Sequence, residues 1–317
     1  MSRRYPLNDP FGSRLPLSRA SLDRDHLSRA LGIDELLTDP RARVIVLHDH
    51  AALLSAPAAL AVHSPDRVPE YELAIYLGRA VEDDGELSAG APVTALIVGE
   101  ETAASLDGEW GELRQLGAEL SVRDAGLFTE ALAMANWHSS YRFSPRSGRA
   151  SIPDAAGWTR RDPENGVESF PRTDAAIIVG ITDEHDRLLL GSNAMWEKNR
   201  FSLLAGFVEP GESLEAAVIR EVFEESGVHV VDPVYKGSQP WPFPASLMVG
   251  FRARVAPGAS TVGTPDGEEI LEVRWFTREE LAALSATGEI RLPGNTSIAR
   301  AIIDDWYGGA LPDGGRW

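Results

Sequence analysis

The residues with the clearest chemical potential are three glutamates that follow a loop rich in glycine and proline. Glu221, Glu224 and Glu225 are three and four positions apart, so on a helix their carboxylates lie within an arc of roughly 100°. Like charges at these spacings destabilise a helix unless a partner neutralises them, and the hard cations Mg²⁺ and Mn²⁺ prefer carboxylate oxygen. The pattern fits a divalent-metal site. The alternative is a solvated acidic face, which is the usual meaning of a run of charges.

A second stretch that could bind a ligand is an aromatic loop downstream of these glutamates. Its residues are, in order, Gln239, Pro240, Trp241, Pro242, Phe243, Pro244, Ala245 and Ser246. Proline fixes φ and stiffens the loop, while Trp241 and Phe243 offer flat apolar faces that suit stacking on a planar ring. Gln239 and Ser246 add hydrogen-bonding groups. On these residues alone, a structural turn with buried aromatic side chains is the more common meaning.

The glutamates are predicted to lie on a helix over residues 213–226, with Ser213 as its N-cap and Gly227 just past its end. Apolar runs around it predict further strands and helices. The predicted strands cover residues 175–181, 188–190, 201–207, 230–235, 247–255 and 272–276, and the predicted helices cover 278–284 and 297–306. A mixed sheet with helices is therefore expected over residues 173–317.

The preceding part of the chain predicts an α+β domain over residues 1–138. Its expected elements are a short helix over 22–37, strands over 44–47, 71–77 and 93–98, and a helix over 123–138. Residues 139–172 are dense in Ser, Pro, Gly and Arg and show little periodicity, which indicates a small loop-rich connector. The expected fold class is α+β.

Composition excludes several kinds of protein. The 317 residues carry a formal net charge of −18, which disfavours a general nucleic-acid binder. The absence of cysteine excludes disulfides, thiolate zinc sites and cysteine nucleophiles, and no serine-hydrolase elbow or P-loop occurs. No uncharged apolar run approaches the ~18–20 residues that span a bilayer, and residues 1–18 lack the apolar segment of a secretory signal. A cytoplasmic protein with no membrane partner is expected.

The glycine loop and the helix resemble the Nudix box, G-x5-E-x7-R-E-U-x-E-E-x-G-U, where U is a bulky aliphatic residue. Every defined position matches, namely Gly206, Glu212, Arg220, Glu221, Val222, Glu224, Glu225, Gly227 and Val228. The resemblance implies a C-terminal Nudix-type α/β/α sandwich and hydrolysis of a diphosphate bond with Mg²⁺ or Mn²⁺. It implies catalytic and metal-binding roles for the three glutamates, a backbone contact from Ala205, and structural roles for Gly206, Gly227 and a Glu212–Arg220 ion pair.

The aromatic loop, with Ser238 before it, is similar to the SQPWPFPxS motif of the NADH pyrophosphatase (NAD diphosphatase) branch of Nudix hydrolases. This resemblance implies cleavage of NADH or NAD⁺ to nicotinamide mononucleotide and AMP, in a homodimer whose sites draw on both chains. It implies further substrate contacts at Phe170 and Ala299, a phosphate contact at Arg114, and a fourth metal carboxylate at Glu269. ADP-ribose and NAD-capped RNA remain alternative substrates. A catalytically silent NAD-sensing module is the third alternative, which the complete box disfavours.

The chain departs from this branch at its usual structural zinc site. Members carry two C-x2-C pairs, and here those positions are Ser144, Ser147, Asp162 and Asn165. Hydroxyls and a single carboxylate are poor zinc ligands compared with thiolates. No structural zinc is expected, and the connector is predicted to be held by hydrogen bonds and packing.

Overall fold

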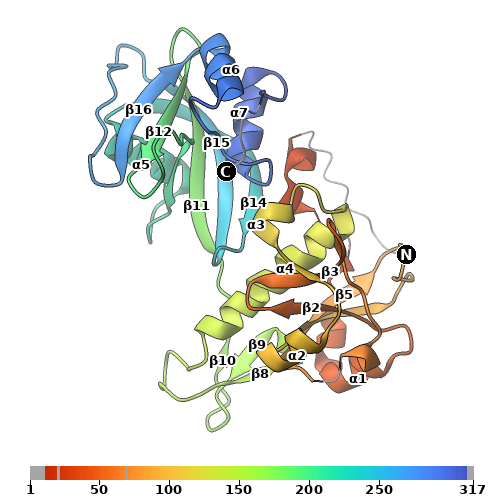
Figure 1. Ribbon diagram of the computed structural model, residues 1–317. Helices are drawn as coiled ribbons and strands as arrows, with labels where there is room; N and C mark the ends of the chain where they lie inside the picture. The colour runs from red at the N-terminus through yellow and green to blue at the C-terminus, as the bar shows by residue number, and fades with distance from the viewer. Residues whose placement is uncertain (1–10, 20–21, 69, 313–317) are drawn as a thin grey trace. The chain divides into compact units, whose positions relative to one another are not determined.

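The computed structural model describes residues 11–19, 22–68 and 70–312 (Figure 1). The chain divides into two compact units. Among the described residues, the N-terminal unit comprises 16–19, 22–68, 70–173 and the short segment Trp241–Ala245, and the C-terminal unit comprises 11–15, Asp174–Pro240 and 246–312. Within the described part of the chain, no helix combines the length and apolar character needed to cross a bilayer.

The N-terminal unit is built on a seven-stranded mixed sheet with the order β1-β5-β6-β2-β3-β4, in which β7 also pairs with β3. The long helix α4 (Val122–Ser140) packs Leu127, Phe128 and Leu132 into the main core of this unit. The strands are β1 (Leu22–Asp23), β2 (Arg43–His48), β3 (Ala51–Ala56), β4 (Ala59–Leu60), β5 (Leu73–Ala80), β6 (Pro92–Ile97) and β7 (Glu109–Glu112). The shorter helices are α1 (Ile33–Thr38), α2 (Glu100–Ser105) and α3 (Leu113–Leu116).

The prediction of one helix over residues 22–37 is wrong in its bounds, since α-helix is confined to Ile33–Thr38. The chain instead forms strand β1, the 3₁₀ helix η3 (His26–Leu31) and then α1. Gly32 separates the two helical segments with φ +82°, a left-handed conformation that glycine adopts without steric cost. The apolar periodicity therefore spans two short helices.

The connector contains a three-stranded sheet, β10 (Glu168–Ser169), β9 (Thr159–Arg161) and β8 (Ile152–Asp154). Its turns are closed around the fully buried carboxylate of Asp162. Asp162 Oδ2 accepts hydrogen bonds from Ser147 Oγ at 2.7 Å and Arg149 Nε at 3.4 Å, and Oδ1 accepts one from the Glu164 amide at 3.0 Å. We call this arrangement the Asp162 hub. It links two turns that are well separated in sequence.

The C-terminal unit has a six-stranded mixed sheet with the order β14-β15-β11-β12-β16, in which β13 also pairs with β11. Helix α5 (Leu214–Ser226) buries Ala217, Val218 and Val222 on one face, whereas α6 (Arg278–Thr287) and α7 (Ile298–Tyr307) cover the other (Figure 1). The strands are β11 (Asp174–Thr182), β12 (Leu188–Asn193), β13 (Leu204–Phe207), β14 (Val230–Trp241), β15 (Ser246–Val255) and β16 (Ile270–Phe276). This is the expected α/β/α sandwich.

Candidate active site

Helix α5 carries the three glutamates, and local sequence sets both of its ends. The Ser213 hydroxyl accepts a hydrogen bond from the Ala216 amide at 3.1 Å, and Gly227 ends the helix in a left-handed conformation at φ +67°. A side-chain oxygen at the N-cap satisfies an amide that has no partner within the helix, and glycine carries no steric penalty at the C-terminal position. The cap predictions are confirmed, so the register of the glutamates is fixed.

The glycine loop holds the backbone close to these carboxylates. A Cβ atom at Gly206 would lie 2.0–2.3 Å from the carboxyl atoms of Glu221, so that side chain packs directly over the bare backbone. Arg220 Nε and Nη2 donate to Glu212 Oε1 and Oε2 at 2.9 and 2.8 Å, and Nη2 also donates to Phe207 O at 3.0 Å. This two-pronged ion pair braces the loop.

Glu225 is buried without a full set of partners. It is 5% exposed, and among the described residues its Oε2 atom has no hydrogen-bond donor. Burial, followed by the negative charges of Glu221, Glu269 and Asp266, raises the pKa of Glu225 to about 8, against an opposing contribution from the Ala205 backbone. Burial also raises the pKa of Glu221. A cation in this cluster would relieve both desolvation and repulsion.

The carboxylates are not arranged around a common point. Within the described ranges, no group of three His, Asp or Glu side chains has a geometry that could hold a metal ion. Arg220 instead supplies the positive charge, since its Nη1 lies 2.9 Å from Glu221 Oε1 and 2.8 Å from Glu224 Oε2. The unpartnered buried oxygen of Glu225 and the all-carboxylate donor set nevertheless fit a hard divalent cation.

Glu269 belongs to this cluster electrostatically, and the turn that presents it depends on Asp266. Asp266 Oδ1 accepts hydrogen bonds from the amides of Glu268, Glu269 and Ile270 at 2.8, 3.0 and 2.9 Å. Sequence analysis did not identify Asp266 as a site residue. The Asp266-Gly267 pair before a strand, which is a common turn signature, is the signal that could have found it.

The aromatic residues of the predicted binding loop lie in the N-terminal unit, where Arg114 and Asn136 hold them. The Arg114 guanidinium lies 4.4 Å from the centre of the Phe243 ring and 5.2 Å from that of Trp241. Asn136 Nδ2 donates to the carbonyls of Pro242 and Pro244 at 2.9 and 3.2 Å. Arg114, predicted as a phosphate contact, thus packs on the rings. Asn136 lies 106 positions from Pro242, and sequence analysis gave no sign of its contact.

The other predicted binding residues differ in accessibility. Gln239 is fully buried in the C-terminal unit, where its Nε2 donates to Thr296 O at 2.7 Å, so its amide makes a structural contact. Ala299 is buried in the first turn of α7, whereas Ser246 is partly exposed at the start of β15. Phe170 is 66% exposed in the N-terminal unit. The structure therefore brings together the box glutamates in one unit, and Arg114 with the two loop aromatics in the other.

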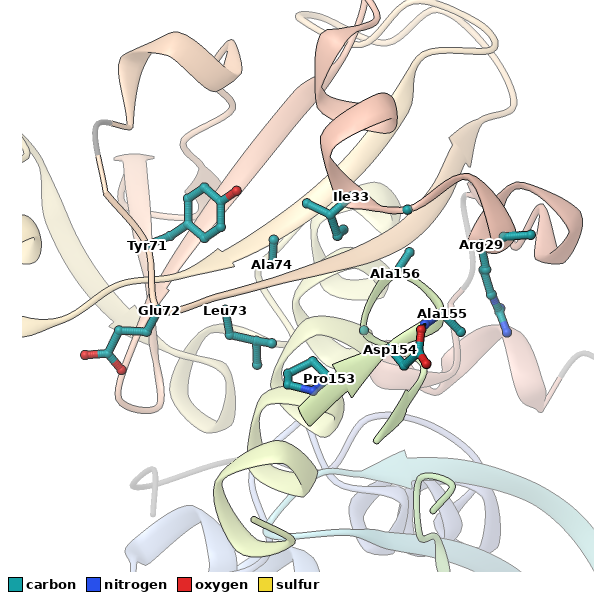
Figure 2. Close-up of a pocket in the computed structure, with 13 residues that line it drawn as sticks. Arg29, Ile33, Tyr71, Glu72, Leu73, Ala74, Pro153, Asp154, Ala155 and Ala156 are labelled. Carbon is teal, nitrogen blue, oxygen red and sulfur yellow. The ribbon is translucent and has the colours of Figure 1, made fainter. Parts of the chain in front are cut away.

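A pocket of about 490 Å³ lies elsewhere in the N-terminal unit, between α1, the start of β5 and residues 153–157 (Figure 2). None of the predicted site residues lines it. Its Asp154 carboxylate already accepts a hydrogen bond from the Ala155 amide at 2.8 Å and forms an ion pair with Arg161. The pocket is therefore distinct from the predicted site.

Comparison with known proteins gives two family matches. Residues 171–293 match the NUDIX domain, and residues 41–137 match the NADH pyrophosphatase-like rudimentary NUDIX domain. Proteins named NAD-capped RNA hydrolase NudC from Mycobacterium bovis and Mycobacterium tuberculosis are each 40% identical, over 94% of this chain and 94% of their own length. A solved Nudix hydrolase from Nitrosomonas europaea covers 55% of this chain and 97% of its own, with TM-score 0.41 and 20% identity. The chain belongs to the NudC-type NADH pyrophosphatase branch of the Nudix hydrolases, enzymes that act on phosphorus anhydrides.

Proposed function

We propose that the chain hydrolyses the diphosphate bond of NADH or NAD⁺, giving nicotinamide mononucleotide and AMP. The observation that carries this proposal is the buried Glu225 carboxylate, with its unpartnered oxygen and a pKa raised to about 8, inside a complete Nudix box. The NAD-capped 5′ end of RNA is the second candidate substrate. The name of the mycobacterial relatives, NAD-capped RNA hydrolase, favours it, and these relatives match over nearly the whole chain.

In this proposal Glu221, Glu224, Glu225 and Glu269, with the backbone of Ala205, hold Mg²⁺ or Mn²⁺. When bound, such a cation neutralises non-bridging phosphate oxygens and lowers the pKa of coordinated water. Glu225 takes the proton from the attacking water, because one oxygen of its buried carboxylate has no donor among the described residues and a neighbouring cation would keep the group ionised. Arg220 retains its two bonds to Glu212 and keeps the loop in place while its Nη1 contacts are exchanged.

The proposed recognition residues bind the planar rings and the phosphates of the substrate. Trp241 and Phe243, fixed by Arg114 and Asn136, offer stiff ring faces, and the exposed Phe170 offers another. The face of the Arg114 guanidinium rests on these rings, while its edge can still donate hydrogen bonds to a phosphate. A homodimer and a cytoplasmic location complete the proposal.

A substrate panel tests the proposal directly. Purified protein with Mg²⁺ or Mn²⁺ is incubated with NADH, NAD⁺, ADP-ribose and NAD-capped RNA, and the products are separated and identified. Release of nicotinamide mononucleotide, together with AMP or a 5′-monophosphate RNA, supports it. Cleavage of ADP-ribose alone would assign another Nudix substrate. Tight NAD binding without turnover would identify a sensing module.

A further inference from the structure

The connector carries net positive charge within an acidic protein. Residues 139–172 contain six arginines and four acidic residues, whereas the whole chain has a net charge of −18. Arg149 and Arg161 form ion pairs with carboxylates of the connector. By contrast, Arg142, Arg146 and Arg160 form no ion pair with any residue in the described ranges. Three guanidinium groups are thus left without a counter-charge.

Arg160 is a buried cation whose hydrogen-bond partners are all neutral. Arg160 is only 8% exposed. Its guanidinium donates to Ser151 Oγ at 3.0 Å, to Ser151 O, and to His138 Nδ1 at 3.0 Å. His138 adds no charge of its own, because burial lowers its pKa to about 4 and keeps the ring neutral. The nearby positive charge of Arg142 adds to burial in lowering the pKa of Arg160. The surface above these groups favours an anion.

A short hairpin presents an aromatic ring beside this charge. Phe143 forms a bridge with Ala150, and the Ser151 amide donates to Arg142 O at 2.9 Å. The Asp162 hub holds the turn of this hairpin through Ser147. Phe143 is 63% exposed, although burial of a large aromatic side chain would normally be favourable, and the exposed Arg142 and Arg146 flank it in sequence.

An exposed ring beside unpaired guanidiniums is the combination that binds single-stranded nucleic acid, since bases stack on the ring and phosphates accept hydrogen bonds from arginine. We propose that Arg142, Phe143 and Arg146, above the buried charge of Arg160, form a connector surface that binds the single-stranded RNA chain following an NAD cap. This inference rests on the proposed function in its capped-RNA form. A free dinucleotide has no RNA chain to occupy the surface, so the connector surface distinguishes the two substrates.

Binding is tested without turnover by fluorescence anisotropy, using a labelled single-stranded 5′-hydroxyl RNA of about 10 nucleotides and no divalent metal. The double variant Arg142→Gln/Arg146→Gln should bind roughly tenfold more weakly, and the slope of log affinity against log salt should fall by about 1.4, or about 0.7 for each lost cation. Phe143→Ala should weaken binding roughly fivefold or more with little change in that slope. The matched control Arg67→Gln/Arg254→Gln removes the same charge from exposed arginines outside the connector and should bind like wild type.

Turnover then separates this inference from the proposed function. The connector variants should lose roughly tenfold in kcat/KM on NAD-capped RNA and keep wild-type kcat/KM on NAD⁺. Equal losses on both substrates, wild-type RNA binding by the double variant, or no RNA binding by the wild type would each overturn the connector surface. So would a Phe143→Ala variant that changes oligomeric state with RNA binding intact, because the ring would then contact another copy. If the wild type binds RNA through these residues but cleaves neither NAD⁺ nor capped RNA, the proposed function fails alone.

Discussion

Two buried carboxylates, Glu225 in the C-terminal unit and Asp162 in the N-terminal unit, have opposite surroundings. Both Asp162 oxygens accept hydrogen bonds, and the Ser147 hydroxyl and the Arg149 guanidinium hold its pKa below the usual range. Glu225 is surrounded by other carboxylates, lacks a donor for one oxygen and has a pKa raised to about 8. Burial therefore does not decide the role of an acid. Of these two acids, the one with hydrogen bonds to both oxygens is structural, and the one surrounded by like charge with an unpartnered oxygen is the proposed ligand-binding group.

Removal of divalent ions should give the largest difference between the Glu225 site and the Asp162 hub. Exhaustive chelation is expected to abolish turnover, because the Glu225 cluster needs a cation, and Mg²⁺ or Mn²⁺ alone should restore it. The melting temperature should fall by only a few degrees, since the Asp162 hub already has its hydrogen bonds. Product analysis and thermal unfolding on the same sample measure both effects. Elemental analysis showing roughly one tightly held zinc per chain would contradict this view of the connector.

The next largest effect is expected from replacing Glu225, the carboxylate that lacks a donor for one oxygen. Glu225→Gln keeps the size of the side chain and should lower kcat by at least ~10²-fold, the scale of losing a general base. Its free energy of unfolding should be unchanged or higher, because a buried like-charge contact is removed. Glu215→Gln, at an exposed position in the first turn of the same helix, is the matched control and should keep wild-type turnover. Near-normal turnover in Glu225→Gln would refute the assignment.

The N-terminal unit should also show a pH dependence of stability that comes from His138 of helix α4. Burial lowers the pKa of His138 from 6.5 to about 4, so between these values the folded protein binds fewer protons than the unfolded chain. The stability that His138 contributes should therefore be lost as pH falls from about 6.5 to about 4. The total loss in the free energy of unfolding is about 3 kcal/mol.

Denaturant unfolding of wild type and His138→Gln across this range provides the measurement, and the wild type should lose stability relative to the variant as pH falls. Glu130 acts in the opposite sense, because burial raises its pKa to about 7 and its contribution declines as pH rises above 4.5. It is present in both proteins, so their difference isolates His138. Parallel profiles would show that the neutral imidazole next to Arg160 has no such role.

The smallest expected effect is that of replacing Asp162, the carboxylate with hydrogen bonds to both oxygens. Asp162→Asn keeps the shape of the hub but removes the charge that faces Arg149, and it should lower the melting temperature by a few degrees. Turnover of NAD⁺ should be unchanged. Glu164→Gln removes the exposed partner of the same arginine and should have less effect. A loss of turnover in Asp162→Asn without a change in melting temperature would break the comparison, because it would give the hub a role in catalysis.

Sequence patterns predicted the local features of the fold and missed those that depend on distant contacts. The caps of α5 lie within a few residues of the groups they satisfy, so Ser213 and Gly227 were identified correctly. Strand β3 was missed because Ala51–Ala56 is rich in alanine and has no β-branched residue. The interruption at Gly32 was missed because apolar periodicity continues across it.

The same distinction holds for the candidate site. The box glutamates were identified by their spacing, but the burial that raises the pKa of Glu225 arises from tertiary packing and is not encoded in that spacing. Gln239 remains a predicted substrate contact, and the structure adds that its buried amide donates to Thr296, 57 positions away. Asn136 reaches the aromatic loop across an even longer separation of 106 residues. A single sequence does not specify such pairings.

The Arg220 guanidinium bonds to the loop on one side and to the helix carboxylates on the other, which bears on how the proposed site would accept an ion. One edge of the group stays fixed to Glu212, while its remaining nitrogen is shared between Glu221 and Glu224. In the proposed metal-bound state, Glu221 and Glu224 would exchange their contact with Arg220 for contact with the cation, while the bonds from Arg220 to Glu212 persist. The proposed metal site would then exchange one positive partner for another on a helix and loop that are already formed without the ion.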